Sequence, residues 1–141
     1  MNVYLDSSVV IRIVFGEPDP LEIWSRIERP VSSQMLGVEC LRTLDRVRLR
    51  DHLDGRAFGE RRRAMIDVIA TIEIVPLEDS ILERAGDPFP TSLGTLDAIH
   101  LATALAIRED LPGMLFATHD DELGLAASSM GFDVQGVDLA A

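Results

Sequence analysis

Four acidic side chains stand where the sequence predicts that strands end or that helices meet a folded core: Asp6, Glu39, Asp97 and Asp120. Carboxylates gathered at such positions would repel one another, and no lysine is available to pair with them, since all 13 strongly basic residues are arginine. A divalent cation would remove that repulsion, and carboxylate oxygens suit Mg²⁺ or Mn²⁺, which keep waters for a phosphate substrate. The acids therefore predict a metal site that acts on phosphate esters.

Two of these acids follow apolar runs that are typical of buried strands. Asp6 ends the run Asn2–Leu5, and Asp120 comes shortly after the run Met114–Ala117. In open α/β sheets, binding sites form beyond the carboxyl ends of the strands. Both acids therefore lie where a site is expected, although Asp6 could instead cap the following helix and Asp120 could be an ordinary acid in the first turn of a helix.

Asp97 lies two residues into a helix that is expected from Thr95 to about Arg108. The rest of this helix is Ala, Ile and Leu on nearly every side, which indicates that it is buried. A carboxylate near its start either favours the helix dipole or belongs to a site. Thr95 is the expected cap, which leaves the carboxylate without a structural need and favours the site.

Glu39 borders the apolar face of another expected helix, Gln34–Arg50, with Cys40 on that face. The acid could reach solvent or pair with Arg42 or Arg46 on the same side of the helix. Its place at the boundary of the core also allows it to join the other acids. The single cysteine excludes an internal disulfide and a cysteine-based zinc site, and we expect it to be a small buried apolar residue.

Strand-like and helix-like segments alternate along the chain. Strands are expected at residues 2–5, 31–33, 72–75, 114–117 and 132–137. Helices are expected at residues 9–15, 20–27, 34–50, 54–70, 79–85, 95–108 and 120–130. This alternation predicts an α/β sandwich with a mainly parallel sheet that is covered by helices on both faces.

The composition indicates a folded protein rather than a disordered or membrane-spanning one. Hydrophobic residues make up 47% of the 141 residues, enough for a proper core. The apolar runs are too short to span a bilayer, and Asp6 and Arg12 interrupt the N-terminal run, unlike a signal peptide. We therefore expect one soluble, cytoplasmic domain.

The charge is unevenly distributed, with a formal net of −11. The tract from Arg42 to Arg63 nevertheless contains eight arginines and four acids, a local net of +4. This arginine tract could contact the phosphate backbone of a nucleic acid. It could equally be a solvated helix face that is balanced by its own acids, and the overall negative charge argues against tight general binding of RNA.

Four segments appear in order along the chain: Tyr4-Leu-Asp-Ser-Ser8, Gly37-Val-Glu-Cys-Leu41, Leu96-Asp-Ala-Ile-His-Leu-Ala-Thr-Ala104 and Ala117-Thr-His-Asp-Asp-Glu-Leu123. Together they resemble the PIN domain, and specifically the VapC-type ribonuclease toxins of bacterial toxin–antitoxin pairs. The third segment is the most specific, and the set covers nearly the whole chain. The resemblance implies a single PIN domain over residues 1–141, a three-layer sandwich with a five-stranded, mainly parallel sheet.

The resemblance also implies which acids form the site. Asp6, Glu39 and Asp97 match three acids of the family. Asp120 matches the fourth, as the Asp of a Thr-x-Asp-x-x-Leu pattern, and Asp121 is the neighbouring alternative.

Three further residues match the family pattern without being expected to do chemistry. Ser8 and Thr118 match hydroxyl positions that help to hold the site. His100 also matches, and we expect it to be a core histidine with satisfied hydrogen bonds rather than a catalytic one.

The implied function is that of a Mg²⁺-dependent (or Mn²⁺-dependent) endoribonuclease that hydrolyses RNA phosphodiester bonds as the toxin of a toxin–antitoxin pair. One or two ions would be held by Asp6, Asp97 and Asp120, with Glu39 as a ligand or as the partner of a bound water. The implied partners are a VapB-type antitoxin and a second copy of the chain. Two alternatives stay open: a non-catalytic PIN-like binding protein, and a PIN nuclease of RNA processing, although the short chain favours the toxin.

Overall fold

The computed structural model of the chain describes residues 1–139 and contains, within them, a five-stranded sheet. Its strands are β1 Asn2–Leu5, β2 Arg29–Ser33, β3 Glu73–Val75, β4 Leu115–Ala117 and β5 Val134–Gln135. Their order is β3-β2-β1-β4-β5, and every pairing is parallel. The predicted α/β class and parallel sheet are therefore confirmed.

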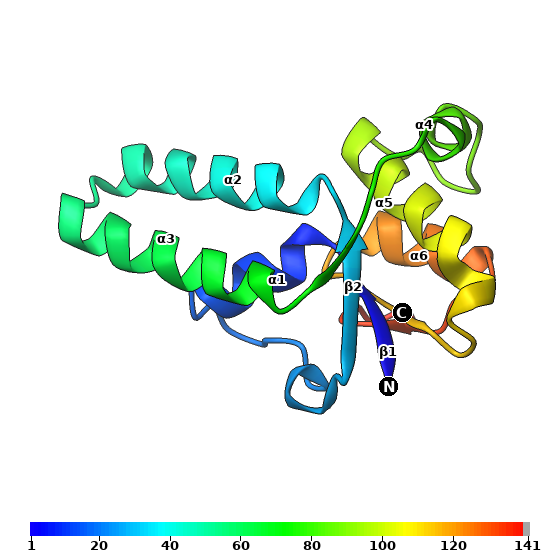
Figure 1. Ribbon diagram of the computed structural model, residues 1–141, viewed down its shortest axis with the longest axis horizontal. Helices are drawn as coiled ribbons and strands as arrows, with labels where there is room; N and C mark the ends of the chain where they lie inside the picture. The colour runs from blue at the N-terminus through cyan, green and yellow to red at the C-terminus, as the bar shows by residue number, and fades with distance from the viewer. Residues whose placement is uncertain (140–141) are drawn as a thin grey trace.

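Helices cover both faces of this sheet (Figure 1). They are α1 Ser7–Val14, α2 Leu36–Asp51, α3 Gly55–Ala70, α4 Asp79–Ala85, α5 Thr95–Ile107 and α6 Asp121–Ser129. The helices α1, α2 and α3 pack together in one layer, whereas α5 and α6 form the other and α4 packs on α5. None of the helices within residues 1–139 is long and apolar enough to cross a membrane.

The central strand β1 sends its side chains alternately into the two layers, as a strand must. Val3 and Leu5 pack in the cluster beneath α1 and α2, whereas Tyr4 packs in the cluster beneath α5 and α6. All three side chains are fully buried. This explains why β1 is a continuous apolar run, because a central strand of a parallel sheet is covered on both faces.

The helix α5 is buried along most of its length, from Ala98 to Ala104. A helix that is apolar on all sides is stable only inside the protein. Its first turn, which carries Asp97, is less buried than the turns that follow. The core therefore anchors the helix while the acid stays near the surface.

The expected helix at residues 20–27 is wrong. A short 3-10 turn, Trp24–Arg26, is the helical part of this segment. Leu21 and Ile23 are both buried, so the apolar pattern repeats every second residue and does not suit a helix. Asp19 before the segment has a left-handed backbone (φ 56°), which prevents a regular helix start at Pro20.

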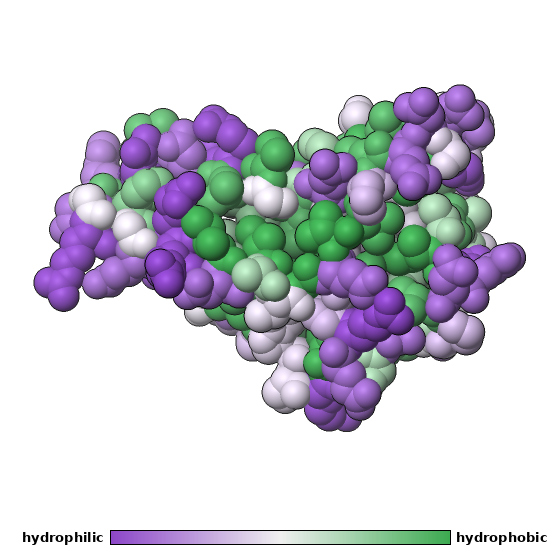
Figure 2. Space-filling model, in the orientation of Figure 1, coloured by the Kyte–Doolittle hydropathy of each residue, from purple (hydrophilic) through white to green (hydrophobic). Residues whose placement is uncertain are grey.

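The helices α2 and α3 form an antiparallel hairpin that projects away from the sheet (Figure 1). His52 ends α2 in the left-handed conformation, and Asp54 begins α3 by accepting a hydrogen bond from the backbone N–H of Ala57 at 2.8 Å. Hydrophilic side chains dominate the far end of this hairpin (Figure 2). The arginine tract lies on this exposed element.

Candidate functional site

Asp6 directly follows β1 and is almost fully buried, with 3% of its surface exposed. Hydroxyl groups donate to both of its oxygens: Ser8 Oγ to Oδ1 at 2.5 Å and Thr118 Oγ1 to Oδ2 at 2.9 Å. Burial raises the pKa of Asp6, although the charge of His100 and the two hydroxyl groups act in the opposite direction. Asp6 occupies the N-cap position of α1, but its side chain makes no capping hydrogen bond, so a capping role does not explain the carboxylate.

Glu39 lies in the first turn of α2, and its side chain is 10% exposed. Its Oε2 accepts a hydrogen bond from Ser7 Oγ at 3.0 Å, and its Oε1 lies 2.6 Å from His100 Nε2. The alternative pairing with Arg42 or Arg46 does not occur. Those two side chains bind Asp45 and Thr43, respectively, which leaves Glu39 turned toward the sheet.

Asp97 lies in the first turn of α5, and within residues 1–139 it has no hydrogen bond or ion pair. Burial raises the pKa of Asp97 to about 6, and the charges of Asp120, Asp6 and Glu39 contribute to the rise. The expected cap is wrong, because Gly94 occupies the N-cap position and Thr95 is already helical. Asp97 therefore faces three other acids without a partner of its own.

Asp120 caps α6, where its Oδ1 accepts a hydrogen bond from the backbone N–H of Leu123 at 2.9 Å. Asp120 therefore has a structural role, but as the cap that precedes the first turn and not as the expected first-turn acid, and its charge also acts on Asp97. Asp121 is the first residue of α6 and is exposed. After burial, the charge of Asp120 is the largest cause of the raised pKa of Asp97.

The two predicted supporting hydroxyls connect the acids to the backbone. Ser8 Oγ, which donates to Asp6, also accepts from the backbone N–H of His119 at 2.9 Å. Thr118 Oγ1 likewise accepts from the backbone N–H of Asp120 at 3.0 Å. Each hydroxyl thus fixes both an acid and the segment that follows β4, in agreement with a supporting role.

His100 is fully buried and has both ring nitrogens hydrogen-bonded, as expected of a satisfied core histidine. Burial disfavours its charged form, but the hydrogen bond to Glu39 and the nearby charges of Asp6 and Asp97 outweigh this effect and raise the pKa of His100. The sequence did not reveal that one of its bonds reaches Glu39. It also gave no role to Ser7, although this residue lies in the Asp6-Ser-Ser8 segment.

The side chains of Asp6, Glu39, Asp97 and Asp120 form what we call the acidic cluster. Their carboxylate oxygens are donors that suit a hard divalent cation. The carboxylates approach closely enough to raise the pKa of Asp97, and hard oxygen ligands are those that Mg²⁺ and Mn²⁺ prefer. Asp97 in particular has three acidic neighbours and, within residues 1–139, no hydrogen-bond donor, although the charge of His100 acts against the rise in its pKa. Within residues 1–139, no three acidic, histidine or cysteine side chains lie in an arrangement that could hold a metal ion.

Most arginines of the tract form ion pairs with acids of the same hairpin, α2 and α3. Five of its eight arginines form ion pairs with acids of α2 or α3: Arg42, Arg48, Arg50, Arg56 and Arg63. Arg61 instead donates to the carbonyl oxygen of Val14 and lies over the ring of Phe15. These pairs are compatible with a solvated helix face, the second of the two interpretations of the tract.

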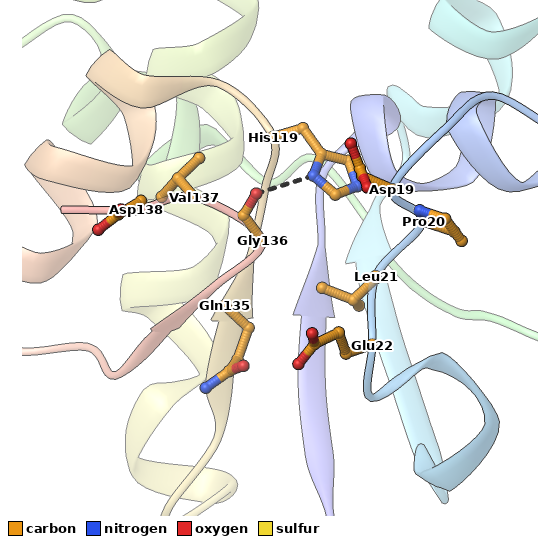
Figure 3. A pocket seen from close by; sticks show the side chains of 9 residues that line it. All are labelled: Asp19, Pro20, Leu21, Glu22, His119, Gln135, Gly136, Val137 and Asp138. Carbon is orange, nitrogen blue, oxygen red and sulfur yellow. Dashed lines mark hydrogen bonds between the residues drawn. The ribbon is translucent and has the colours of Figure 1, made fainter.

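A pocket of about 540 Å³ lies beside the acidic cluster but excludes its four acids (Figure 3). Its wall includes Asp19, Gln135 and His119, whose Nδ1 donates to the carbonyl oxygen of Gly136 at 2.9 Å. His119 lies between Thr118 and Asp120, so its backbone belongs to the cluster while its side chain lines the pocket. The acidic cluster is therefore a separate feature of the surface.

The chain matches the PIN domain family over residues 3–127. The chain belongs to the PIN domain family. This PIN domain is 36% identical over 135 residues to Ribonuclease VapC46 of Mycobacterium tuberculosis, covering 94% of this chain and 95% of that protein. It is 28% identical over 137 residues to Ribonuclease VapC47 of the same species, covering 92% and 93%.

Solved structures show the same fold. The crystal structure of PAE2754 from Pyrobaculum aerophilum matches with a TM-score of 0.64 at 15% identity, covering 95% of this chain and 89% of that one. The structure of VapBC-1 from nontypeable Haemophilus influenzae matches with a TM-score of 0.59 at 14% identity, covering 96% and 97%. Because these identities are low, these two similarities concern the fold alone.

Proposed function

We propose that this PIN domain is a Mg²⁺- or Mn²⁺-dependent endoribonuclease that hydrolyses RNA phosphodiester bonds and acts as the toxin of a toxin–antitoxin pair. The observation that carries the proposal is the cluster of Asp6, Glu39, Asp97 and Asp120, in which Asp97 has no hydrogen bond or ion pair within residues 1–139 and the other three acids help to raise its pKa. Similarity over nearly the full length to proteins named ribonuclease supports the choice of RNA as the substrate.

Each acid would have a distinct part in holding the cation. Asp6, Asp97 and Asp120 would be ligands, and Glu39 would be a ligand or would accept a hydrogen bond from a coordinated water. When bound, the cation would activate water for attack on phosphorus and stabilise the charge on the leaving oxygen. Ser8 and Thr118 keep the carboxylate of Asp6 in one orientation, and the cap on α6 does the same for Asp120.

The proposed partners are a VapB-type antitoxin and a second copy of the chain, in the cytoplasm. The net charge of −11 is compatible with a partner that presents basic side chains. Leu82 on α4 and Leu96 on α5 are exposed apolar side chains, and hydrophobic surface extends across the middle of the face shown in Figure 2. Contiguous apolar surface of this kind often marks a protein interface.

The test uses purified wild-type protein and the variants Asp6→Asn and Asp97→Asn, which remove one charge each with little change in shape. Both variants are expected to lose Mg²⁺-dependent cleavage of RNA and to keep the fold by circular dichroism. Asp121→Asn is the matched control and is expected to cleave like the wild type. Cleavage that survives in both variants, in preparations free of contaminating nuclease, would refute the metal-site proposal.

Two measurements separate the proposal from its alternatives. Titration calorimetry with Mn²⁺ is expected to show binding, whereas its absence in the wild type would favour a non-catalytic binding protein. Expression with and without an adjacent upstream reading frame for a small antitoxin tests the toxin role. Growth arrest that the second gene relieves is expected, and sequencing of the cleaved ends would then identify the RNA target. Cleavage without growth arrest would favour RNA processing.

A further inference from the structure

We propose that His100 is a positioning residue that fixes the carboxylate of Glu39 for the acidic cluster, and that Tyr4 in turn fixes His100. This inference rests on the proposed metal-dependent function, which it deepens. It assigns a role to a buried hydrogen-bond network that links three elements, β1, α2 and α5. Neither Tyr4 nor His100 is among the proposed ligands of the cation.

The network is continuous and lies inside the protein. Tyr4 Oη lies 2.8 Å from His100 Nδ1, and His100 Nε2 lies 2.6 Å from Glu39 Oε1. Tyr4 and His100 are both fully buried. The ring of Tyr4 is held by stacking on Phe116, with centroids 5.2 Å apart, and meets the His100 ring edge-on at 5.8 Å. Because both side chains are buried, neither can exchange its hydrogen-bond partner for water.

The chemistry of the donors fixes the direction of the bond to Glu39. An ionised carboxylate only accepts hydrogen bonds, so His100 Nε2 must carry the proton that it shares with Glu39. This holds for neutral and for charged imidazole alike. Only the direction of the bond between Nδ1 and the hydroxyl of Tyr4 differs between the two forms. Ser7 donates to the other oxygen, so both oxygens of Glu39 are held, and each keeps a further lone pair for a cation or a water.

The position of His100 explains what this bond achieves. His100 is three residues after Asp97 on α5, which places the two side chains on the same side of the helix, one turn apart. Glu39 lies on α2, in the layer that covers the opposite face of the sheet. The bond from His100 to Glu39 therefore joins the two layers at the acidic cluster and sets the position of Glu39 relative to Asp97. Outer groups that orient ligands in this way typically change metal affinity or activity 10–100-fold.

Two substitutions at one position separate positioning from packing. His100→Leu removes both hydrogen-bonding nitrogens and keeps an apolar side chain, whereas the amide N–H of His100→Gln can still donate to Glu39. Tyr4→Phe removes one hydroxyl and keeps the ring stacked on Phe116. Met65→Ala, at the buried position of α3, is the control for a general loss of stability. All are compared at one pH, at a temperature where each is folded by circular dichroism.

The primary measurement is the dissociation constant for Mn²⁺ by calorimetry, followed by kcat and KM on a fluorogenic RNA oligonucleotide. His100→Leu is expected to weaken Mn²⁺ binding and lower kcat by about 10–100-fold with little change in KM. His100→Gln is expected to recover most of both, and Tyr4→Phe to lose a smaller factor. Met65→Ala is expected to lower the melting temperature without weakening Mn²⁺ binding.

Three results would overturn the inference. His100→Leu could bind Mn²⁺ like the wild type, His100→Gln could lose as much as His100→Leu, or Met65→Ala could lose as much affinity as His100→Leu at a similar melting temperature. If His100→Leu does not fold, His100→Ala takes its place: Mn²⁺ binding that is weakened in His100→Ala, less weakened in Tyr4→Phe and mostly recovered in His100→Gln supports the inference, and wild-type binding by His100→Ala overturns it. A wild type that neither binds Mn²⁺ nor cleaves RNA overturns the proposed function as well, so the two failures are distinguishable.

Discussion

Replacing Asp97 with asparagine is expected to stabilise the metal-free protein at neutral pH while it removes cleavage. Asparagine has nearly the same shape as aspartate and carries no charge. In the folded protein, the carboxylate of Asp97 is partly buried and faces Asp120, Asp6 and Glu39, without a hydrogen-bond donor among residues 1–139. Ionising this group in the fold therefore costs more free energy than ionising it in the unfolded chain.

The magnitude follows from the pKa of Asp97, which rises from its ordinary value of 3.8 to about 6. The folded state holds this proton more tightly, so the stability that it contributes is fully present below pH 3.8 and is lost as the pH rises through about 6. The complete loss corresponds to about 3 kcal/mol as an upper bound. Because the side chain is partly exposed and solvent screens its charge, a gain of about 1–2 kcal/mol at pH 7 is a better expectation for the variant.

The assay is urea unfolding followed by circular dichroism, in EDTA, with wild type and variant measured side by side. A series from about pH 7.5 down to about pH 5 stays above the isoelectric point near 4.5, where solubility is lowest. The stability gap between the two proteins should shrink to roughly half by pH 5, as the wild-type carboxyl gains its proton. Saturating Mg²⁺ should also reduce the difference in stability, because an ion that binds only the folded wild type stabilises the wild type and not the variant.

The control for this assay is Asp121→Asn, which removes the same charge from an exposed position one residue beyond Asp120. We expect no gain there, and a loss of up to about 1 kcal/mol, because an acid in the first turn favours the helix dipole. If Asp97→Asn is no more stable than wild type at pH 7, the reasoning is refuted. If Asp121→Asn gains as much, relief of the overall charge of −11 explains the effect and the local argument fails.

Three further predictions concern the support of the cluster. Gly136→Ala should lower the free energy of unfolding in urea by about 2–5 kcal/mol, because φ is +101° and the new Cβ would collide with the carbonyl oxygen of Thr118. Gly113→Ala is the control: φ is also positive (+75°), but no atom lies within 4 Å of the new Cβ, so the loss should be only about 1 kcal/mol. The free energy of unfolding of Asp120→Asn should be about 1 kcal/mol higher than that of Asp120→Ala, because both lose the charge but only asparagine keeps the cap on α6. Cys40 should resist thiol reagents in native buffer, because it is buried and burial raises its pKa to about 12; rapid stoichiometric labelling would contradict this.

The sequence was sufficient for the sheet and for the positions of the acids because both depend on short-range patterns. The runs that form β1 and β4 are apolar, and the acids that follow them lie at the carboxyl ends of adjacent parallel strands. A parallel sheet necessarily brings those ends to one edge. The all-apolar α5 could likewise be assigned to the core from its composition alone.

The partners of the acids could not be predicted, because they depend on how the helices pack across the sheet. Glu39 and His100 are 61 positions apart in sequence, and their contact depends on the orientation of α2 relative to α5. Local pairing with Arg42 looked equally reasonable, yet Asp45 takes that arginine instead. The same limit applies to Thr95: residue type suggested a cap, but the chain enters α5 one residue earlier, at Gly94.

The donors that hold the acids explain why the cluster keeps its negative charge. Within residues 1–139, the side-chain donors to Asp6 are the hydroxyls of Ser8 and Thr118, and those to Glu39 are the hydroxyl of Ser7 and the imidazole of His100. Hydroxyl groups orient a carboxylate without neutralising it, whereas His100, whose pKa is raised by these acids, offsets only part of their charge. The arginines that form ion pairs bind other acids, most of them on the hairpin. The fold thus orients its carboxylates while repulsion remains, most evident at Asp97, and the proposed cation would relieve it.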